Sequence, residues 1–330
     1  MSLLEVRNWQ LAFEGESKLL KVLNGIDLKI EAGQTVGLVG ESGSGKSVMG
    51  LSIMGLLADN ARPIAGEIIF NGEKMAPLSK DSNSHLRGSQ ISMIFQDPVG
   101  SLNPAFTVGY QIAETLKIHQ QLQGKSVDDR CRELLQMVGI SDPAARLKAY
   151  PHELSGGMAQ RVMIAIAIAC RPKLLIADEP TTALDVTIQA QILNLLKQLQ
   201  REYKLAVLLI SHDMGVIAQN CERVNVMYCG EVIEEGTAQA VIHSPRHPYT
   251  KSLLNCLPSK YIFTKSELTR LPAIPGLVPS LSDRPTGCVF QDRCYKAQEI
   301  CKEKPPYIIF PEQKSACFFA HDKDLGPEHM

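Results

Sequence analysis

The chain has 330 residues, of which 45% are hydrophobic and 21% charged, with 34 Lys and Arg against 35 Asp and Glu. This is the mixture of a globular protein of about two domains, and a formal charge of −1 argues against a nucleic-acid partner. The longest apolar run, at 162–170, is far shorter than the roughly 18 residues of a membrane span. The first residues show no signal-peptide core, so we expect a soluble protein of the cytoplasm.

Short apolar runs alternate with longer amphipathic ones along most of the chain. Buried strands are predicted at 35–39, 91–95, 174–177 and 206–210, and helices at 46–57, 159–170 and 188–203. Strands separated by helices favour a parallel sheet covered on both faces, and hence an α/β fold. The stretch 97–171 is mostly helical in pattern, which predicts a helical subdomain inserted into that fold.

Proline marks a change of character near residue 258. Residues 1–258 contain 11 prolines, whereas the much shorter stretch 259–330 contains 8, and proline interrupts regular elements. We therefore expect a core domain over 1–258 and a small, loop-rich appendage over 259–330.

The segment GESGSGKS at 40–47 follows a predicted strand and opens a predicted helix. It matches the phosphate-loop pattern GxxxxGK[ST] in full. Glycines allow the loop to turn its backbone N–H groups toward a phosphate, and the helix start adds its positive dipole end. Lys46 is expected to reach the β- and γ-phosphates and Ser47 to bind Mg²⁺. The predicted phosphate-binding residues are Gly40, Glu41, Ser42, Gly43, Ser44, Gly45, Lys46 and Ser47.

Two carboxylates, Asp178 and Glu179, come directly after the strand predicted at 174–177. The carboxyl ends of parallel strands form the edge at which α/β sheets bind ligands. Asp178 is the candidate Mg²⁺ ligand, directly or through water, and Glu179 is the candidate general base for an attacking water. Strands often end in acids that are simply solvated, so it is the phosphate loop that favours a functional role here.

Further motifs make residues 1–258 resemble the ATP-binding cassette (ABC) ATPases. They are Gln96 after a predicted strand, LSGG at 154–157, PTTALD at 180–185 and SHD at 211–213. The resemblance implies a P-loop nucleotide-binding domain with a helical subdomain, which hydrolyses ATP with Mg²⁺. It also implies that Glu179 is the base, that His212 contacts the γ-phosphate, and that Gln96 joins Ser47 and Asp178 at the Mg²⁺ ion.

In that family, two ATP molecules are clamped between two cassettes. The resemblance implies that the LSGG residues Ser155, Gly156 and Gly157 bind the ATP held by the partner subunit. Phe13 stands where the family places an aromatic residue against adenine, although a lone aromatic residue near an N-terminal strand is also ordinary core. Since none of the motifs is degenerate, we expect a cassette that is competent in hydrolysis.

ABC ATPases serve membrane importers and also soluble systems of translation or DNA maintenance. The soluble kind usually carries two cassettes or a long coiled coil, whereas this chain has one phosphate loop and no heptad run. The sequences FQDPVGSLNP at 95–104, DVTIQAQ at 185–191, HPYT at 247–250 and IPG at 274–276 resemble the oligopeptide/dipeptide/nickel group of bacterial importers. Within that group the similarity is greatest to the first ATPase subunit of the dipeptide type.

This second resemblance implies a peripheral ATPase on the cytoplasmic face of the membrane that energises uptake of di- or oligopeptides. The implied partners are a homologous second ABC ATPase, two permease subunits and an extracytoplasmic solute-binding protein. Nickel, or another solute of the same group, is the alternative cargo. We expect the isolated subunit to be largely monomeric or weakly dimeric and slow as an ATPase, because its partners are missing.

Four cysteines of the appendage resemble the C-terminal cysteine motif of the same group, which implies one [4Fe–4S] cluster. They are Cys288, Cys294, Cys301 and Cys317. A zinc site and unliganded thiols are the alternatives, while a reducing cytosol argues against disulfides. We expect the cluster to be mainly structural. We also expect it to lie well away from the ATP site, because the appendage carries no phosphate-binding motif.

Overall fold

The computed structural model describes residues 2–15, 18–76, 83–257 and 273–322. In this part of the chain the strands form two sheets, one of order β2-β1-β4-β5 and one of order β11-β12-β10-β9-β3-β8-β7-β6. The strands are β1 (Ser2–Glu14), β2 (Leu19–Glu31), β3 (Thr35–Val39), β4 (Ala61–Phe70), β5 (Glu73–Lys74), β6 (Ile91–Ile94), β7 (Leu174–Asp178), β8 (Ala206–Ser211), β9 (Arg223–Tyr228), β10 (Glu231–Thr237), β11 (Tyr307–Ile309) and β12 (Gln313–Ala316).

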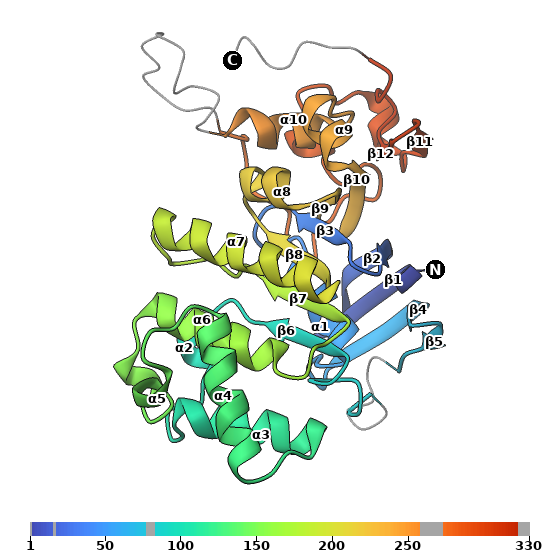
Figure 1. The fold of residues 1–330 in the computed structure, drawn as a ribbon. Helices are drawn as coiled ribbons and strands as arrows, with labels where there is room; N and C mark the ends of the chain where they lie inside the picture. The colour runs from blue at the N-terminus through green and yellow to red at the C-terminus, as the bar shows by residue number, and fades with distance from the viewer. Residues whose placement is uncertain (1, 16–17, 77–82, 258–272, 323–330) are drawn as a thin grey trace, which may run out of the picture.

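Ten α-helices accompany these strands in the described ranges (Figure 1). They are α1 (Lys46–Met54), α2 (Pro98–Ser101), α3 (Val108–Gln120), α4 (Lys125–Met137), α5 (Pro143–Arg146), α6 (Gly156–Ile168), α7 (Val186–Tyr203), α8 (Met214–Asn220), α9 (Ala238–His243) and α10 (Pro248–Asn255).

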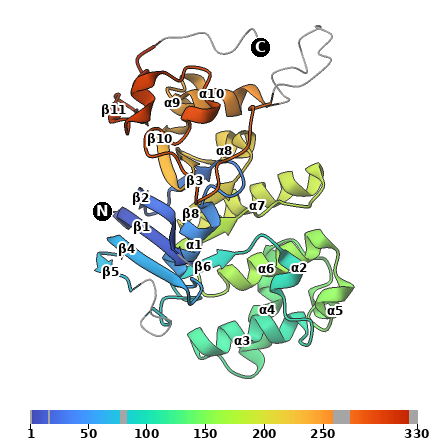
Figure 2. The same cartoon turned by 180° about the vertical axis from the view of Figure 1, so that it is seen from behind.

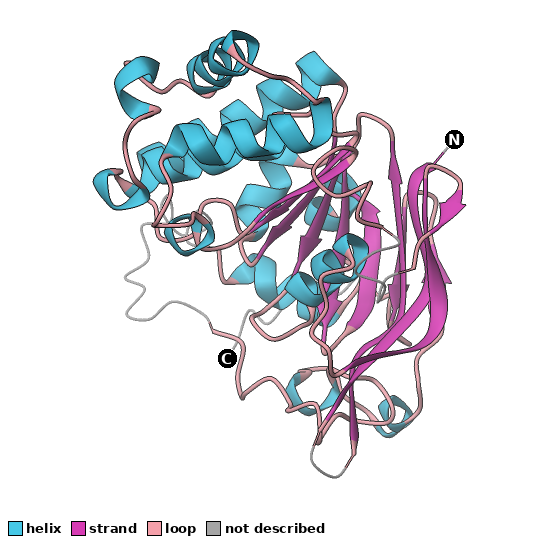
Figure 3. Ribbon diagram, turned by 90° about the horizontal axis from the view of Figure 1, so that it is seen from below, coloured by secondary structure: helices cyan, strands magenta, loops and turns pink. Residues whose placement is uncertain are grey.

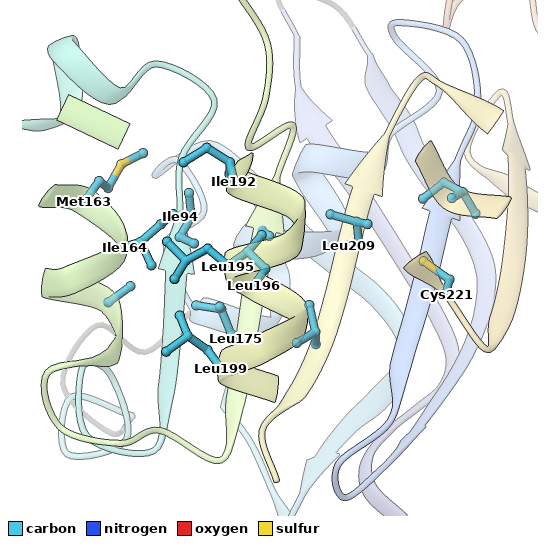
Figure 4. Close-up of a cluster of buried hydrophobic side chains, with 14 of the residues drawn as sticks. Ile94, Met163, Ile164, Leu175, Ile192, Leu195, Leu196, Leu199, Leu209 and Cys221 are labelled. Atoms are coloured by element: carbon cyan, nitrogen blue, oxygen red, sulfur yellow. The ribbon is translucent and has the colours of Figure 1, made fainter. Parts of the chain in front are cut away.

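The four predicted strands are β3, β6, β7 and β8, and they are parallel, as predicted. Their residues are almost all buried, because helices or the second sheet cover both faces, and this gives continuous apolar runs. On one face, α7 packs against the sheet beside α6. Figure 4 shows Ile192, Leu195 and Leu199 of α7 near Leu175 of β7 and Ile164 of α6.

The second, antiparallel sheet was not predicted from the sequence. Its strands alternate only imperfectly between buried and exposed residues, because β1 pairs with β2 through several register shifts. Met49 and Ile53 of α1 belong to one buried cluster with Leu23 and Ile26 of β2, so the helix after the phosphate loop lies against this sheet. Its long strands run along one side of the molecule, away from most of the helices (Figure 3).

Residues 97–171, all of them described, contain α2 to α6 and no strand. These helices and the C-terminal elements lie at opposite ends of the main sheet in both views (Figures 1 and 2). The limits of a helical subdomain stay a prediction.

The described C-terminal residues pack onto the main sheet. β12 pairs with β10, and β11 pairs with β12, so they lengthen the sheet at its edge. Cys288, Phe290 and Cys301 belong to the main buried core. The predicted boundary between 258 and 259 lies outside the described residues and stays a prediction. Among the described helices, none has the length and apolar character needed to cross a membrane.

Candidate nucleotide-binding and catalytic site

The phosphate loop joins the end of β3 to the start of α1, as predicted. A Cβ atom at Gly40 would lie 2.1 Å from the carbonyl oxygen of Met227, so a side chain has no room there. Gly45, the residue before the helix, has a φ of 99°, in the region that favours glycine. The glycine spacing in the sequence thus reflects tight packing at one position and backbone conformation at another.

Lys46 is buried at the start of α1, with 5% of its surface exposed. Its Nζ donates hydrogen bonds to the carbonyl oxygens of Gly40 (2.8 Å) and Glu41 (3.0 Å). Burial lowers its pKa, while the carboxylates of Glu179, Asp178 and Glu41 act in the opposite direction. A cation is therefore held within the loop, where a phosphate would be bound.

Asp178 ends β7 as a buried carboxylate beside this lysine. Burial raises its pKa, and a hydrogen bond with the Ser47 side chain lowers it in part. Its Oδ1 atom is buried and has no hydrogen-bond partner among the described residues. A carboxylate and a hydroxyl side by side, with one oxygen still free, suit Mg²⁺, which binds few protein ligands and keeps several waters.

Glu179 brings the predicted catalytic residues together. Its Oε2 accepts a hydrogen bond from Gln96 Nε2 (2.9 Å) and another from Thr182 Oγ1 (2.9 Å). His212 Nδ1 lies 3.1 Å from its Oε1. Glu179 has a φ of 47°, uncommon for a residue other than glycine, and its N–H donates to the carbonyl oxygen of Ile210 (2.9 Å). The side chains of Gln96, Thr182 and His212 therefore meet on one carboxylate.

Thr182 was not predicted as a site residue. The signal was present, because it lies in the PTTALD sequence that supports the family resemblance, but nothing in the sequence shows that its hydroxyl points back to Glu179. The predicted contact of Gln96 with Mg²⁺ stays a prediction, since its described contact is with Glu179.

The signature residues lie in a different part of the molecule. Ser155 is the N-cap of α6, and its hydroxyl accepts a hydrogen bond from the N–H of Met158 (3.3 Å). Ser155 and Gly156 are exposed, on the same side of the sheet as the other helices of 97–171. Phe13 lies on β1, partly buried against the core of the antiparallel sheet. Both sets remain candidates for nucleotide contacts.

The four cysteines were expected to lie well away from this site, yet the residue directly before Cys294 contacts the phosphate loop. Arg293 forms an ion pair with Glu41, the second residue of the phosphate loop, at 2.7 Å. The hydroxyl of Tyr249, on α10, accepts a hydrogen bond from the Glu41 N–H (2.9 Å). The sequence did not predict these contacts, because the chain returns to the loop after β10 and a contact between such distant segments leaves no local pattern.

The expected iron–sulfur site is not supported by the structure. Among the described residues, no group of three or more His, Cys, Asp or Glu is positioned to hold a metal ion. The cysteines are free thiols, and burial raises the pKa of Cys288 to about 12 and of Cys317 to about 11. The four thiols nevertheless lie close enough for each to act on the pKa of others, since Cys294, Cys301 and Cys317 all contribute at Cys288.

Comparisons with known proteins agree with this geometry. Residues 23–182 match the family model of ABC transporters, and residues 233–301 match that of the oligopeptide/dipeptide transporter C-terminal region. The dipeptide transport ATP-binding protein DppD of Escherichia coli (strain K12) is 48% identical over 328 residues, 99% of each chain. The oligopeptide transport ATP-binding protein OppD of Salmonella typhimurium (strain LT2) is 47% identical over 317 residues, 96% of this chain and 93% of that protein.

A solved structure of the ATP-binding cassette MJ0796, a dimer in a post-hydrolysis state bound to ADP and Pi, is also similar. It has a TM-score of 0.64 and 31% identity, and it covers 71% of this chain and 98% of that one. The fold expected from the sequence is thereby confirmed, and ATP and Mg²⁺ follow from the family. The chain belongs to the ATP-binding proteins of ABC transporters, and its C-terminal region is of the oligopeptide/dipeptide transporter type.

Proposed function

We propose that this chain is the ATP-hydrolysing subunit that drives uptake of di- or oligopeptides across a membrane. The observation that carries the catalytic part is the meeting of Gln96, Thr182 and His212 on the carboxylate of Glu179, beside the phosphate loop. The peptide cargo rests on relatives named for dipeptide and oligopeptide transport that match nearly the whole chain.

In this proposal Glu179 is the general base that activates water for attack on the γ-phosphate. Its hydrogen-bond donors, together with the backbone at φ 47°, fix the direction in which the carboxylate points. His212, whose side chain is 60% exposed, is available to a γ-phosphate entering from solvent. Gln96 connects the base to the helices that follow it along the chain.

The nucleotide is bound by the phosphate loop and Lys46, with Phe13 against the adenine. Ser47, Asp178 and Gln96 would hold Mg²⁺, which neutralises phosphate charge during transfer. The free buried oxygen of Asp178 supports this assignment. The signature residues Ser155, Gly156 and Gly157, of which the first two are exposed, complete the ATP site of a second cassette, which we propose to be a homologous ATPase subunit.

The remaining proposed partners are two permease subunits and an extracytoplasmic solute-binding protein. The chain sits beneath the permeases as a peripheral subunit on the cytoplasmic face of the inner membrane. In isolation it is expected to be monomeric or weakly dimeric, and sedimentation with and without ATP would measure this.

For the C-terminal thiols we propose one [4Fe–4S] cluster held by Cys288, Cys294, Cys301 and Cys317. Four buried or half-buried thiols provide the donor set of such a cluster. The Sγ atoms of Cys294 and Cys317 accept hydrogen bonds from the N–H groups of Lys296 and Phe319 (both 3.4 Å), an arrangement suited to negatively charged sulfur. The cluster would supply a cross-link for a segment with few regular elements.

Protein purified without oxygen tests the cluster. We expect about four irons per chain, the number of a cubane cluster. Stoichiometric zinc without iron would replace the cluster by a zinc site, and four titratable thiols without metal would exclude both.

Transport is tested by reconstituting the chain with the permeases, second cassette and binding protein of its own transporter. ATP hydrolysis should rise when the binding protein is loaded with a dipeptide. Stimulation by nickel and by no peptide would contradict the proposed cargo while keeping the ATPase.

A further inference from the structure

The second residue of the phosphate loop, Glu41, is held from outside the cassette motifs. Arg293 Nη1 donates to Glu41 Oε2 (2.7 Å), and Nη2 donates to Oε1 (3.0 Å). Two parallel hydrogen bonds between a guanidinium and a carboxylate fix their relative orientation as well as their distance. The side chain of Arg293 is 5% exposed and that of Glu41 28% exposed, so water competes little for this pair.

The side chain of Arg293 is also held by contacts other than the one with Glu41. Its Nε donates to the carbonyl oxygen of Pro275 (2.9 Å), and Nη1 also donates to the hydroxyl of Tyr228 (3.2 Å). A Cβ atom at Gly276 would lie 3.4 Å from Arg293 Cγ, so the backbone of the IPG sequence packs against the arginine stem. The guanidinium therefore presents a rigid fork to Glu41.

The backbone of Glu41 is held at two further points. Its N–H donates to the Tyr249 hydroxyl (2.9 Å), and its carbonyl oxygen accepts from Lys46 Nζ (3.0 Å). Tyr249 packs with Tyr228 (ring centroids 4.7 Å apart) and with Phe290 (5.2 Å). Glu41 thus connects the lysine of the phosphate loop to residues of the C-terminal segment.

We propose that Arg293 is a positioning residue of the nucleotide site, which acts through Glu41 to hold the phosphate loop in its binding conformation. A loop that is ordered before the ligand arrives avoids the entropy cost of ordering at the moment of binding. Arg293 has its effect on ATP affinity through this loop, whereas Glu179 governs turnover. The inference rests on the proposed function, because it concerns the same ATP site.

The chain offers a matched control in Arg284. This arginine belongs to the same segment and also forms an ion pair with low exposure, at 2.9 Å, but its partner is Glu231, which is not part of the phosphate loop. Arg293→Lys and Arg284→Lys each keep the charge and lose the fork. Comparing the two separates loss of the loop contact from general loosening of the segment.

The experiment measures the Kd for MgATP of the full-length wild type, Arg293→Lys, Glu41→Gln, the double variant and Arg284→Lys, below all their melting temperatures. We expect Arg293→Lys and Glu41→Gln each to raise the Kd by about fivefold or more. The Kd of the double variant should not exceed the larger of the two single-variant values, because both changes break the same contact. Arg284→Lys should bind MgATP like the wild type. In the reconstituted transporter, Arg293→Lys should raise KM and leave kcat within about twofold.

Equal Kd values in wild type and Arg293→Lys would overturn the proposal, even if the melting temperature fell, and so would multiplicative effects of the two single variants. If Arg293→Lys does not fold, Glu41→Gln tests the proposal by itself. An unchanged Kd for MgATP in Glu41→Gln would also overturn the proposal. A wild-type chain that binds no ATP would overturn the proposed function itself. A wild type and an Arg293 variant that bind ATP equally well would overturn only the role of Arg293.

Discussion

Arg293 and Glu41 lie 252 positions apart in the chain, yet their side chains form a two-fold hydrogen-bonded ion pair at 2.7 and 3.0 Å. The first residue of this pair immediately precedes Cys294, and the second is part of the phosphate loop. The C-terminal segment and the nucleotide site are therefore in direct contact. We therefore expect changes in the cysteine-containing segment to alter the affinity for ATP.

Replacing Cys294 by Ser tests this contact from the C-terminal side. The Cys294 Sγ accepts a hydrogen bond from the Lys296 N–H (3.4 Å) and packs against the main core, directly after the short turn that carries Arg293. We expect Cys294→Ser to weaken ATP binding by about threefold, as the arginine fork becomes less rigid. Cys131→Ser, at a buried thiol of α4, is the control and should leave the Kd unchanged. An unchanged Kd in both variants would show that the turn does not transmit the change.

Replacing Lys46 by Ala tests the phosphate loop. The buried ammonium group is the cation at the loop, and a charge-assisted hydrogen bond contributes about 1.5–3 kcal/mol. We expect Lys46→Ala to raise the Kd for MgATP by about 10- to 100-fold, measured by calorimetry. Lys29→Ala, at an exposed residue paired with Glu31, should bind like the wild type. Equal affinities in all three proteins would show that Lys46 does not bind the phosphates.

We expect His247 to contribute to the pH dependence of the free energy of unfolding. Burial lowers its pKa to about 3, from an ordinary value of 6.5. Below about pH 6.5 this histidine is therefore protonated in the unfolded chain but stays neutral in the folded chain. The free energy of unfolding falls as the pH is lowered below about 6.5. Between pH 7 and pH 5 the loss is about 2 kcal/mol, since each pKa unit is worth about 1.4 kcal/mol.

His247→Asn should remove this loss. His247 Nδ1 accepts a hydrogen bond from the Tyr249 N–H (3.1 Å) at the start of α10. The side-chain oxygen of an asparagine can accept the same hydrogen bond, and asparagine does not titrate. Burial raises the pKa of the neighbouring Glu234 to about 7, which adds stability as the pH falls toward 4.5, but this contribution is common to both proteins. We expect the melting temperature of the variant to fall less between pH 7 and pH 5 than that of the wild type. Parallel curves would contradict the assignment.

The sequence predicted some parts of the molecule well for physical reasons. Strands β3, β6, β7 and β8 are buried on both faces and so appear as unbroken apolar runs. The antiparallel sheet gave no such signal, because bulges between Val6 and Trp9 interrupt its alternation. The meeting of Gln96 and His212 at Glu179 could be predicted because each of the three follows a strand end. The hydroxyl of Thr182 and the guanidinium of Arg293 could not, because their roles depend on side-chain direction and on distant contacts.

The central claim is that Glu179 activates the water that hydrolyses ATP, and its replacement by Gln is the most direct test. The measurement is the ATP turnover rate of the reconstituted transporter, together with the amount of ATP bound at equilibrium. We expect Glu179→Gln to lower turnover by about 100-fold or more while ATP remains bound between the paired cassettes, because only the proton acceptor is lost. Glu133→Gln, at an exposed residue of α4, should turn over like the wild type. Near-wild-type turnover by Glu179→Gln would contradict the account.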